Sequence, residues 1–225
     1  MDGMGYVLDL ASPLPRGIDK NDYFLPAVKE TTAVLKEVTR VSSIKKIVVT
    51  SSIGALFPLG GLPDGDIIRE DNDWDFSVNQ SANFVDRNYP IAAPMRLYTA
   101  SKLLVNEAPW EFRDTAKPHY SLVSIHPSYV YGHNLVQESA EEVKRSSNGG
   151  LWSTIMNGVP ARSITGVHIQ DVAEVHIKAL DPNVLDGTRY LNSGKKATWK
   201  EVGEVVQREY STVGAKIAIE IDGVS

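Results

Sequence analysis

Tyr98 and Lys102 are the residues of this 225-residue chain whose types and spacing best suit them to chemistry. Four positions apart on a helix, two side chains lie on nearly the same face. Because a neighbouring positive charge stabilises a phenolate, the spacing predicts that Lys102 lowers the pKa of Tyr98. Such a phenol can exchange a proton with a substrate oxygen near neutral pH. None of the other tyrosines has a lysine four residues later.

Hydroxyl side chains follow a strand that is expected to lie near this pair. Thr50, Ser51 and Ser52 come directly after the strand expected at Ile44–Val49. Its apolar run Ile47-Val48-Val49 is typical of a parallel strand buried on both faces. Ligands of parallel α/β sheets bind outside the carboxyl ends of the strands. These hydroxyls are therefore candidates for contacting a substrate carbonyl. Small polar residues also terminate strands without any function, so their position alone leaves both interpretations open.

The elements that must position these residues alternate along the chain. We expect strands at residues 6–10, 44–50, 122–126 and 188–192, and helices at residues 22–41, 94–116, 140–157, 171–180 and 198–210. Residues 54–93 are rich in Gly, Pro, Asp and Asn and favour loop structure. Alternating strands and helices predict an α/β fold with a mostly parallel sheet and flanking helices. Pro109 predicts a kink in the helix that carries Tyr98.

Two of the expected helices begin with a capping-box sequence, in which a polar N-cap residue is followed three positions later by glutamate. These are Asp171 with Glu174, and Thr198 with Glu201. Asp171 and Glu174 could also form a carboxylate pair for acid–base chemistry. The capping box explains both residues without chemistry, and we prefer it.

Composition excludes several classes of function. A net charge of −5 without a basic cluster argues against nucleic acid or an anionic membrane as a partner. The absence of cysteine excludes disulfides and thiolate metal sites. The histidines are scattered without ligand spacing, so no metal site is expected. No apolar run approaches the ~20 residues of a membrane span, and the N-terminus lacks the apolar core of a signal peptide. We expect a cytoplasmic protein.

Six segments resemble motifs of the extended short-chain dehydrogenases/reductases and occur in the same order. They are Ala11-Ser12-Pro13, Pro26-Ala27-Val28, Val49-Thr50-Ser51-Ser52, Tyr98-Thr99-Ala100-Ser101-Lys102, Pro127-Ser128-Tyr129-Val130-Tyr131-Gly132 and Val167-His168-Ile169-Gln170-Asp171-Val172-Ala173. The chain looks most like the branch that contains dihydroflavonol reductases, cinnamoyl-CoA reductases and fungal methylglyoxal/aldehyde reductases. The similarity extends from about residue 5 to about residue 210.

The resemblance implies a reductase that acts on a small-molecule ketone or aldehyde. Tyr98 would protonate the carbonyl oxygen as hydride arrives from NADPH. Lys102 would lower the pKa of Tyr98 and hold the nicotinamide ribose. Ser52 would hydrogen-bond the same carbonyl oxygen, with Ser51 as the alternative.

The resemblance also implies a set of residues that hold the cofactor NADP(H). Besides Tyr98 and Lys102, they are Ala11, Ser12 and Thr50 along the cofactor, and Pro127 with the backbone of Val130 at the nicotinamide end. The sequence lacks the glycine-rich G-x-x-G-x-x-G or G-x-G-x-x-G turn that binds the pyrophosphate in this family. The part of the NADP(H) site that binds the pyrophosphate therefore has no evident counterpart in this sequence.

The first strand of this chain matches the fourth strand of the family. We therefore expect a truncated Rossmann-like core at residues 1–132. Residues 133–225 would form a small, incomplete substrate lobe with a returning core strand and helix, in one compact unit with the first segment. Residues 6–10 would then be an exposed sheet edge, which favours pairing with another chain. A homodimer through that edge or through the catalytic helices is expected.

Three functions remain open at this point. The first is NADP-dependent reduction of a carbonyl compound. The second is a cofactor-independent isomerase, dehydratase or cyclase that uses Tyr98, Lys102 and Ser52 for acid–base chemistry. The third is a non-catalytic binding or regulatory protein.

Overall fold

The computed structural model of the chain describes residues 3–11, 17–85, 92–158 and 164–217. The chain divides into two compact units. The first comprises residues 1–127 and 174–192, and the second comprises residues 128–173 and 193–225. The sequence placed the boundary after residue 132, whereas the division falls after Pro127. Tyr98, Lys102 and Ser52 all lie in the first unit.

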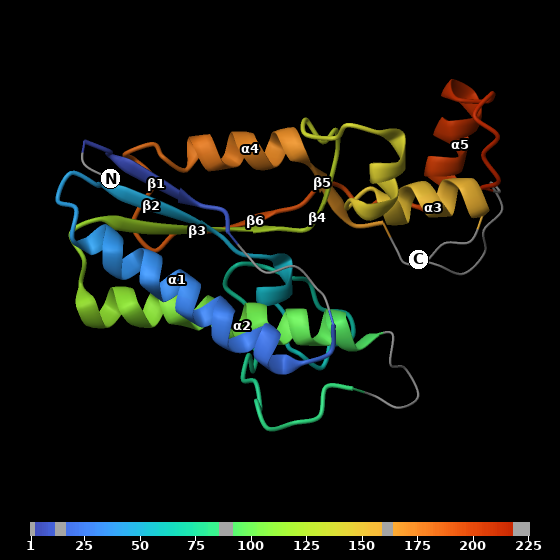
Figure 1. Cartoon of the computed structure of the whole chain (residues 1–225). Coiled ribbons are helices and arrows are strands. Elements are labelled where there is room, and N and C mark those ends of the chain that lie inside the picture. The colour runs from blue at the N-terminus through green and yellow to red at the C-terminus, as the bar shows by residue number, and fades with distance from the viewer. Residues whose placement is uncertain (1–2, 12–16, 86–91, 159–163, 218–225) are drawn as a thin grey trace. The chain divides into compact units, whose positions relative to one another are not determined.

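The first unit contains a parallel four-stranded sheet in the order β1-β2-β3-β6 (Figure 1). The strands are β1 (Tyr6–Asp9), β2 (Lys46–Thr50), β3 (Ser121–Pro127) and β6 (Arg189–Asn192). Three of them lie inside the predicted ranges, and β3 extends its range by one residue at each end. The predicted α/β class with a mostly parallel sheet is confirmed.

Helices cover both faces of this sheet. Helices α1 (Phe24–Thr39) and α2 (Ala93–Ala116) pack on one face (Figure 1). Alternation along β2 explains the arrangement, because Ile47 joins the apolar cluster of that face. Val48 points the opposite way, toward Ala179 at the end of helix α4 (Ile169–Lys178). Successive apolar residues on a strand therefore hold two helical layers.

Helix α2, which carries Tyr98 and Lys102, was predicted at residues 94–116 and is observed from Ala93 to Ala116. It continues through Pro109 and ends at Lys117, whose φ of 45° is left-handed. The kink expected at Pro109 stays a prediction. The uninterrupted first half of the helix matters most for function, because it fixes the relative orientation of Tyr98 and Lys102.

Besides the first residues of α4, the described part of the second unit contains a two-stranded parallel sheet and three helical segments. They are β4 (Tyr129–Tyr131), β5 (Gly166–His168), the 3-10 helix η4 (Ala140–Arg145), α3 (Gly149–Asn157) and α5 (Trp199–Glu209). The sequence predicted neither strand, since three residues are too few to show alternation. The helix predicted at residues 140–157 is divided into η4 and α3. The capping box of Thr198 and Glu201 is confirmed at the start of α5.

The capping box predicted at Asp171 is wrong. Helix α4 begins at Ile169, so Asp171 lies in its first turn and not at its N-cap. The ring Nδ1 of His168 accepts a hydrogen bond from the Gln170 backbone N–H at 3.3 Å. It thereby satisfies one of the N–H groups of the first turn, which have no partner within the helix. Glu174 instead pairs with Lys178, with Oε1 and Nζ 2.7 Å apart.

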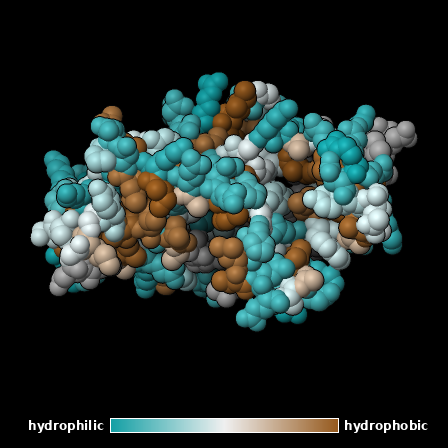
Figure 2. All heavy atoms as spheres, turned by 90° about the horizontal axis from the view of Figure 1, so that it is seen from above, coloured by the Kyte–Doolittle hydropathy of each residue, from teal (hydrophilic) through white to brown (hydrophobic). Residues whose placement is uncertain are grey.

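Strand β1 forms one edge of the described sheet, with β2 as its hydrogen-bonded neighbour. Apolar side chains are exposed along it and at its ends, namely Met4, Tyr6, Leu8 and Leu10. Figure 2 shows that apolar side chains also gather in patches between polar ones on the face seen there. In the described part of the chain, no helix has the length and apolar character needed to cross a membrane.

Candidate active site

Tyr98 and Lys102 lie side by side on α2, as their spacing predicted. The Nζ of Lys102 is 5.4 Å from the centre of the Tyr98 ring. Lys102 is only 5% exposed, and Tyr98 is half-buried. The helix therefore holds an ammonium group and a phenol together in a place with little water.

Burial, rather than the neighbouring lysine, decides the ionisation of Tyr98. It raises the pKa of the Tyr98 phenol above its usual value, and a hydrogen bond with the Ser52 side chain acts in the opposite direction. The predicted lowering of this pKa by Lys102 is therefore wrong for this structure. The physical reason is that withdrawal from water disfavours the phenolate more than its partners favour it. At neutral pH Tyr98 is protonated and can act as an acid.

Burial also weakens the hold of Lys102 on its proton. It lowers the pKa of the Lys102 ammonium to about 8, and the negative charge of Asp9 acts in the opposite direction. Asp9 ends β1 and is itself largely buried, so its pKa is raised above the usual value. Sequence reasoning missed Asp9. The available signal was a carboxylate inside the otherwise apolar run Tyr6–Leu10.

Ser52 stands just after β2, where it caps the short 3-10 helix η2 (Ile53–Ala55). Its Oγ accepts a hydrogen bond from the Gly54 backbone N–H at 3.1 Å, and its side chain also hydrogen-bonds with Tyr98. The structure thus brings together the serine and the tyrosine that the sequence selected. The Oγ of Ser51, the alternative serine, is buried and has no hydrogen-bond partner among the described residues.

His126 is a buried group next to this site to which the sequence gave no role. It is fully buried on β3. Its Nε2 lies 2.8 Å from the Ser124 Oγ, and its Nδ1 lies 3.3 Å from the backbone oxygen of Ser52. Burial lowers its pKa to about 4, so the ring is neutral at physiological pH. The available signal was Ser124 and His126 at strand spacing, on the same face of β3.

Three of the predicted cofactor residues line one small cavity in the first unit. Ala11, Thr50 and Lys102 surround a space of about 10 Å³, together with residues of α1 and α2. The Oγ1 of Thr50 lies 2.7 Å from the Nε2 of His176, a second buried histidine. Ser12, also predicted to line the cofactor, falls outside the described residues.

The two predicted residues at the nicotinamide end belong to different units. Pro127 ends β3 in the first unit, and Val130 lies in β4 of the second. The turn after Val130 is held by Asn148, whose side-chain amide exchanges two hydrogen bonds with the backbone of Gly132, at 3.1 and 2.7 Å. Gly132 has a φ of +136°, and a Cβ there would lie 2.6 Å from the Ile169 side chain. This turn therefore requires glycine.

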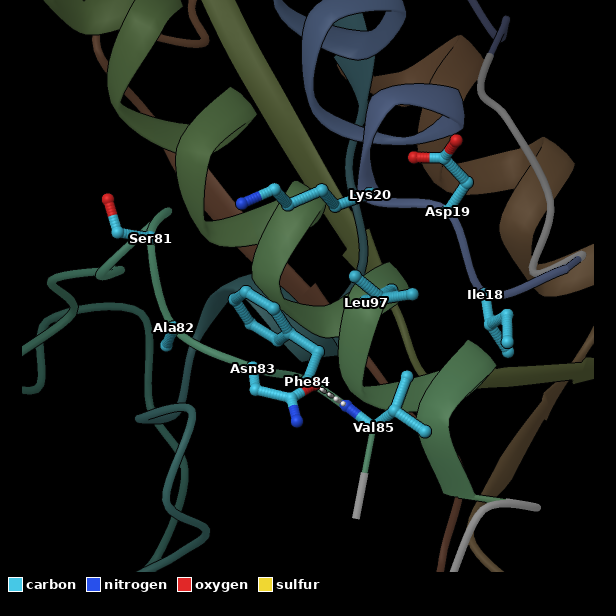
Figure 3. A pocket seen from close by; sticks show the side chains of 9 residues that line it. All are labelled: Ile18, Asp19, Lys20, Ser81, Ala82, Asn83, Phe84, Val85 and Leu97. Carbon is cyan, nitrogen blue, oxygen red and sulfur yellow. Dashed lines mark hydrogen bonds between the residues drawn. The ribbon is translucent and has the colours of Figure 1, made fainter. Parts of the chain in front are cut away.

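A larger hollow of about 520 Å³ opens at the start of α2 in the same unit (Figure 3). Its walls come from the segment before α1, from the loop before α2, which includes Phe84, and from Leu97. Tyr98 packs against the apolar cluster that contains Leu97 and Phe84. The Nζ of Lys20 is engaged at the rim, since it donates to the Gln80 carbonyl at 2.8 Å.

The described part of the chain contains no cluster of side chains suited to binding a metal ion. No three His, Cys, Asp or Glu side chains gather there in an arrangement that could hold an ion.

Comparison with known proteins supplies the family. Ketoreductase sphI of Aspergillus fumigatus is 57% identical over 225 residues, covering 99% of this chain and 68% of that protein. Ketoreductase CTB6 of Cercospora nicotianae is 26% identical and covers 99% of this chain and 63% of that protein. The crystal structure of yeast methylglyoxal/isovaleraldehyde reductase Gre2 complexed with NADPH matches with a TM-score of 0.73 at 21% identity, over 97% of this chain and 64% of that one. No family model matches the chain.

The chain thus spans about two thirds of the length of these relatives, 68% and 63% of the two ketoreductases. Identity to the first relative is high over nearly all of the chain, and the parallel sheet with its flanking helices agrees with the solved structure. The chain therefore belongs to the extended short-chain dehydrogenase/reductase family.

Proposed function

We propose that this chain reduces a small-molecule ketone or aldehyde, with NADPH as the hydride donor and Tyr98 as the acid. The observation that carries the proposal is the contact set around Tyr98. Ser52 hydrogen-bonds with the phenol, and the buried Lys102 ammonium lies 5.4 Å from its ring. The similarity to a ketoreductase, 57% identical over 225 residues, supports the same reaction class.

The proton-transfer half follows from the ionisation of these groups. Because burial raises its pKa, Tyr98 holds its proton at neutral pH and can give it to a carbonyl oxygen. On substrate binding the Ser52 hydroxyl would turn its single hydrogen from Tyr98 to the same carbonyl oxygen, as negative charge develops on that oxygen. The phenolate left behind is stabilised by the Lys102 ammonium, which carries its charge below about pH 8.

The residues around Lys102 suit the nicotinamide riboside end of NADPH. A buried ammonium and the Thr50 hydroxyl are hydrogen-bonding groups of the kind that ribose hydroxyls require, and Ala11 lies beside them. In the proposed reaction Lys102, Thr50 and Ala11 hold this part of the cofactor. Bound NADPH supplies the hydride that is added to the carbonyl carbon. With the proton from Tyr98 on the oxygen, the product is the alcohol.

A titration tests this proposal without knowledge of the substrate. NADPH is added to the purified chain while the tryptophan fluorescence is followed. Quenching that saturates in the micromolar range, with the same affinity in the Tyr98→Phe variant, is the expected result. Absence of binding up to millimolar NADPH would overturn the proposal for this chain. Turnover without NADPH that still needs Tyr98 would instead identify a cofactor-independent acid–base enzyme.

We also propose that the chain forms a homodimer, through the exposed β1 edge or through α1 and α2. The apolar side chains exposed along β1 support the first arrangement, because an open strand edge favours pairing. Light scattering on the chain and on the Leu8→Lys variant distinguishes the two. A charge at Leu8 dissociates a dimer that uses the edge and leaves one that uses the helices. The cytoplasmic location stays a prediction from the sequence.

A further inference from the structure

His126 connects the core of the sheet to the backbone of the candidate catalytic serine. It is fully buried on β3 and lies on the same strand face as Ser124. One ring nitrogen contacts Ser124 within the strand, and the other contacts the backbone oxygen of Ser52, outside it. This connection is separate from the contact set that the proton transfer uses, since the ring nitrogens of His126 contact Ser124 and the Ser52 backbone rather than Tyr98.

The partners assign the hydrogens of the ring. A backbone carbonyl only accepts hydrogen bonds, so Nδ1 carries the hydrogen that is donated to the oxygen of Ser52 at 3.3 Å. The neutral ring then has a lone pair on Nε2, which accepts from the hydroxyl of Ser124 at 2.8 Å. Burial favours the neutral ring, and the nearby charges of Arg189, Glu70 and Lys102 partly offset one another. The donor toward Ser52 is therefore fixed.

Two backbone hydrogen bonds lie on either side of the His126 contact. The Ser51 backbone N–H donates to the Ile125 carbonyl at 2.7 Å, which ties the chain to β3 one residue before Ser52. The Ser52 carbonyl also accepts from the Ala55 N–H at 2.9 Å, within the short helix that Ser52 caps. The His126 bond joins the residue that caps that short helix to the sheet. Without it, the Ser52 carbonyl keeps only the bond from Ala55 within the helix.

We propose that His126 is a positioning residue, whose Nδ1 donor holds the Ser52 carbonyl and thereby keeps the Ser52 hydroxyl against Tyr98. The effect on catalysis rests on the proposed reductase function. The effect on the phenol does not, because it requires only that the Ser52 side chain interacts with Tyr98 and favours its phenolate.

Two amide substitutions separate positioning from simple filling of the core. The nitrogen of an asparagine side chain can occupy the place of Nδ1, whereas the longer glutamine places its amide near the position of Nε2. His126→Asn therefore keeps a donor toward Ser52, and His126→Gln keeps only a partner for Ser124. Each variant loses one buried hydrogen bond, so both are expected to lower the melting temperature by comparable amounts.

The expected results differ sharply between the two variants. In His126→Gln, kcat falls about tenfold or more while the KM for NADPH stays the same, because a small displacement of a catalytic group is costly. His126→Asn retains kcat within about threefold. In a Ser52→Ala background, His126→Gln has little further effect, because the two residues act as one unit. Equal losses of kcat in the Asn and Gln variants would overturn the proposal.

A second measurement needs neither substrate nor NADPH. The ultraviolet titration of Tyr98 is isolated by subtracting the titration of the matching Tyr98→Phe protein. His126→Gln raises the pKa of Tyr98, since the hydrogen bond from Ser52 that favours the phenolate is weakened, and His126→Asn leaves this pKa in place. Ser124→Ala, which frees the ring while leaving it present, is the second variant if His126→Gln does not fold, and it raises the pKa in the same direction. An unchanged Tyr98 titration in every folded variant would overturn the proposal even if the chain proves to be a reductase.

Discussion

The Nζ of Lys102 lies 5.4 Å from the centre of the Tyr98 ring. Burial favours the neutral form of each group, so it raises the pKa of Tyr98 and lowers the pKa of Lys102. Tyr98 holds its proton more tightly than a free tyrosine, and Lys102 holds its proton less tightly than a free lysine. The pair is therefore arranged for a phenol that gives up a proton during the reaction, not for a phenolate that is present beforehand. The positive charge of Lys102 stabilises Tyr98 most strongly once the phenolate has formed.

Removal of the phenol oxygen tests the acid. Tyr98→Phe should lower kcat for carbonyl reduction by about 10²- to 10⁴-fold, because general acid catalysis contributes about that much. The affinity for NADPH should change little, since the ring remains in its apolar cluster. Steady-state kinetics and the fluorescence titration measure the two effects. Activity within threefold of the unchanged chain would show that another group supplies the proton.

The charge of Lys102 should set the alkaline limit of activity. Because burial lowers its pKa to about 8, the ammonium loses its proton as the pH rises through that value. We expect kcat/KM to fall above about pH 8 and the fall to move to higher pH in Lys102→Arg, whose guanidinium stays charged. A profile of kcat/KM between pH 6 and pH 10 measures this. An unchanged alkaline limit in the arginine variant would contradict the assignment.

The two serines after β2 should differ in their effect on turnover. Ser52→Ala removes a hydroxyl that contacts Tyr98, and should lower kcat by about 10²-fold, as loss of an oxyanion donor does. Ser51→Ala removes a buried hydroxyl without a partner in the described residues and should be nearly neutral, which makes it the matched control. A larger loss from Ser51→Ala would transfer the catalytic role to Ser51.

Acid should destabilise the fold through His126. Its pKa is lowered to about 4 in the folded chain, against 6.5 for the unperturbed group, so the unfolded chain binds more protons between these values. Stability is therefore retained above about pH 6.5 and lost as the pH falls toward 4. Linkage gives about 2 kcal/mol less stability at pH 5 than at pH 7 from this residue.

Urea unfolding at the two pH values measures this difference. His126→Asn, which cannot titrate in this range, should show a pH dependence that is smaller by that amount. Equal pH dependence in the two proteins would show that His126 is neutral in the unfolded chain as well or charged in the folded one.

The sequence predicted those parts of the fold that local patterns determine. The apolar runs predicted the four strands of the main sheet, and α1 and α2 were predicted to within two residues and one residue, respectively, at each end. The strands β4 and β5 were missed because three residues are too few to show a pattern. The start of α4 was predicted at Asp171, whereas the helix begins two residues earlier, at Ile169, and the ring of His168 accepts a hydrogen bond from its first turn.

The site could be predicted only where residues are linked by local spacing or by motif. Tyr98 and Lys102 share a helix face, and Ser52 follows a strand at the edge where ligands bind. Asp9 and His126 were missed because their importance comes from residues distant in the sequence, Lys102 and Ser52. The pKa of Tyr98 was predicted in the wrong direction because spacing reveals the neighbouring charge and not the depth of burial.

Isotope transfer tests the proposed reaction most directly. The chain is incubated with NADPH that carries deuterium at both C4 positions and a panel of carbonyl compounds that includes methylglyoxal, and the products are analysed by mass spectrometry. The account predicts an alcohol with deuterium on the former carbonyl carbon, formed by the unchanged chain and the Ser51→Ala control and at least 10²-fold more slowly by Tyr98→Phe, as expected for loss of a general acid. An alcohol without deuterium, or formation of the deuterated alcohol at the same rate in Tyr98→Phe, would contradict it.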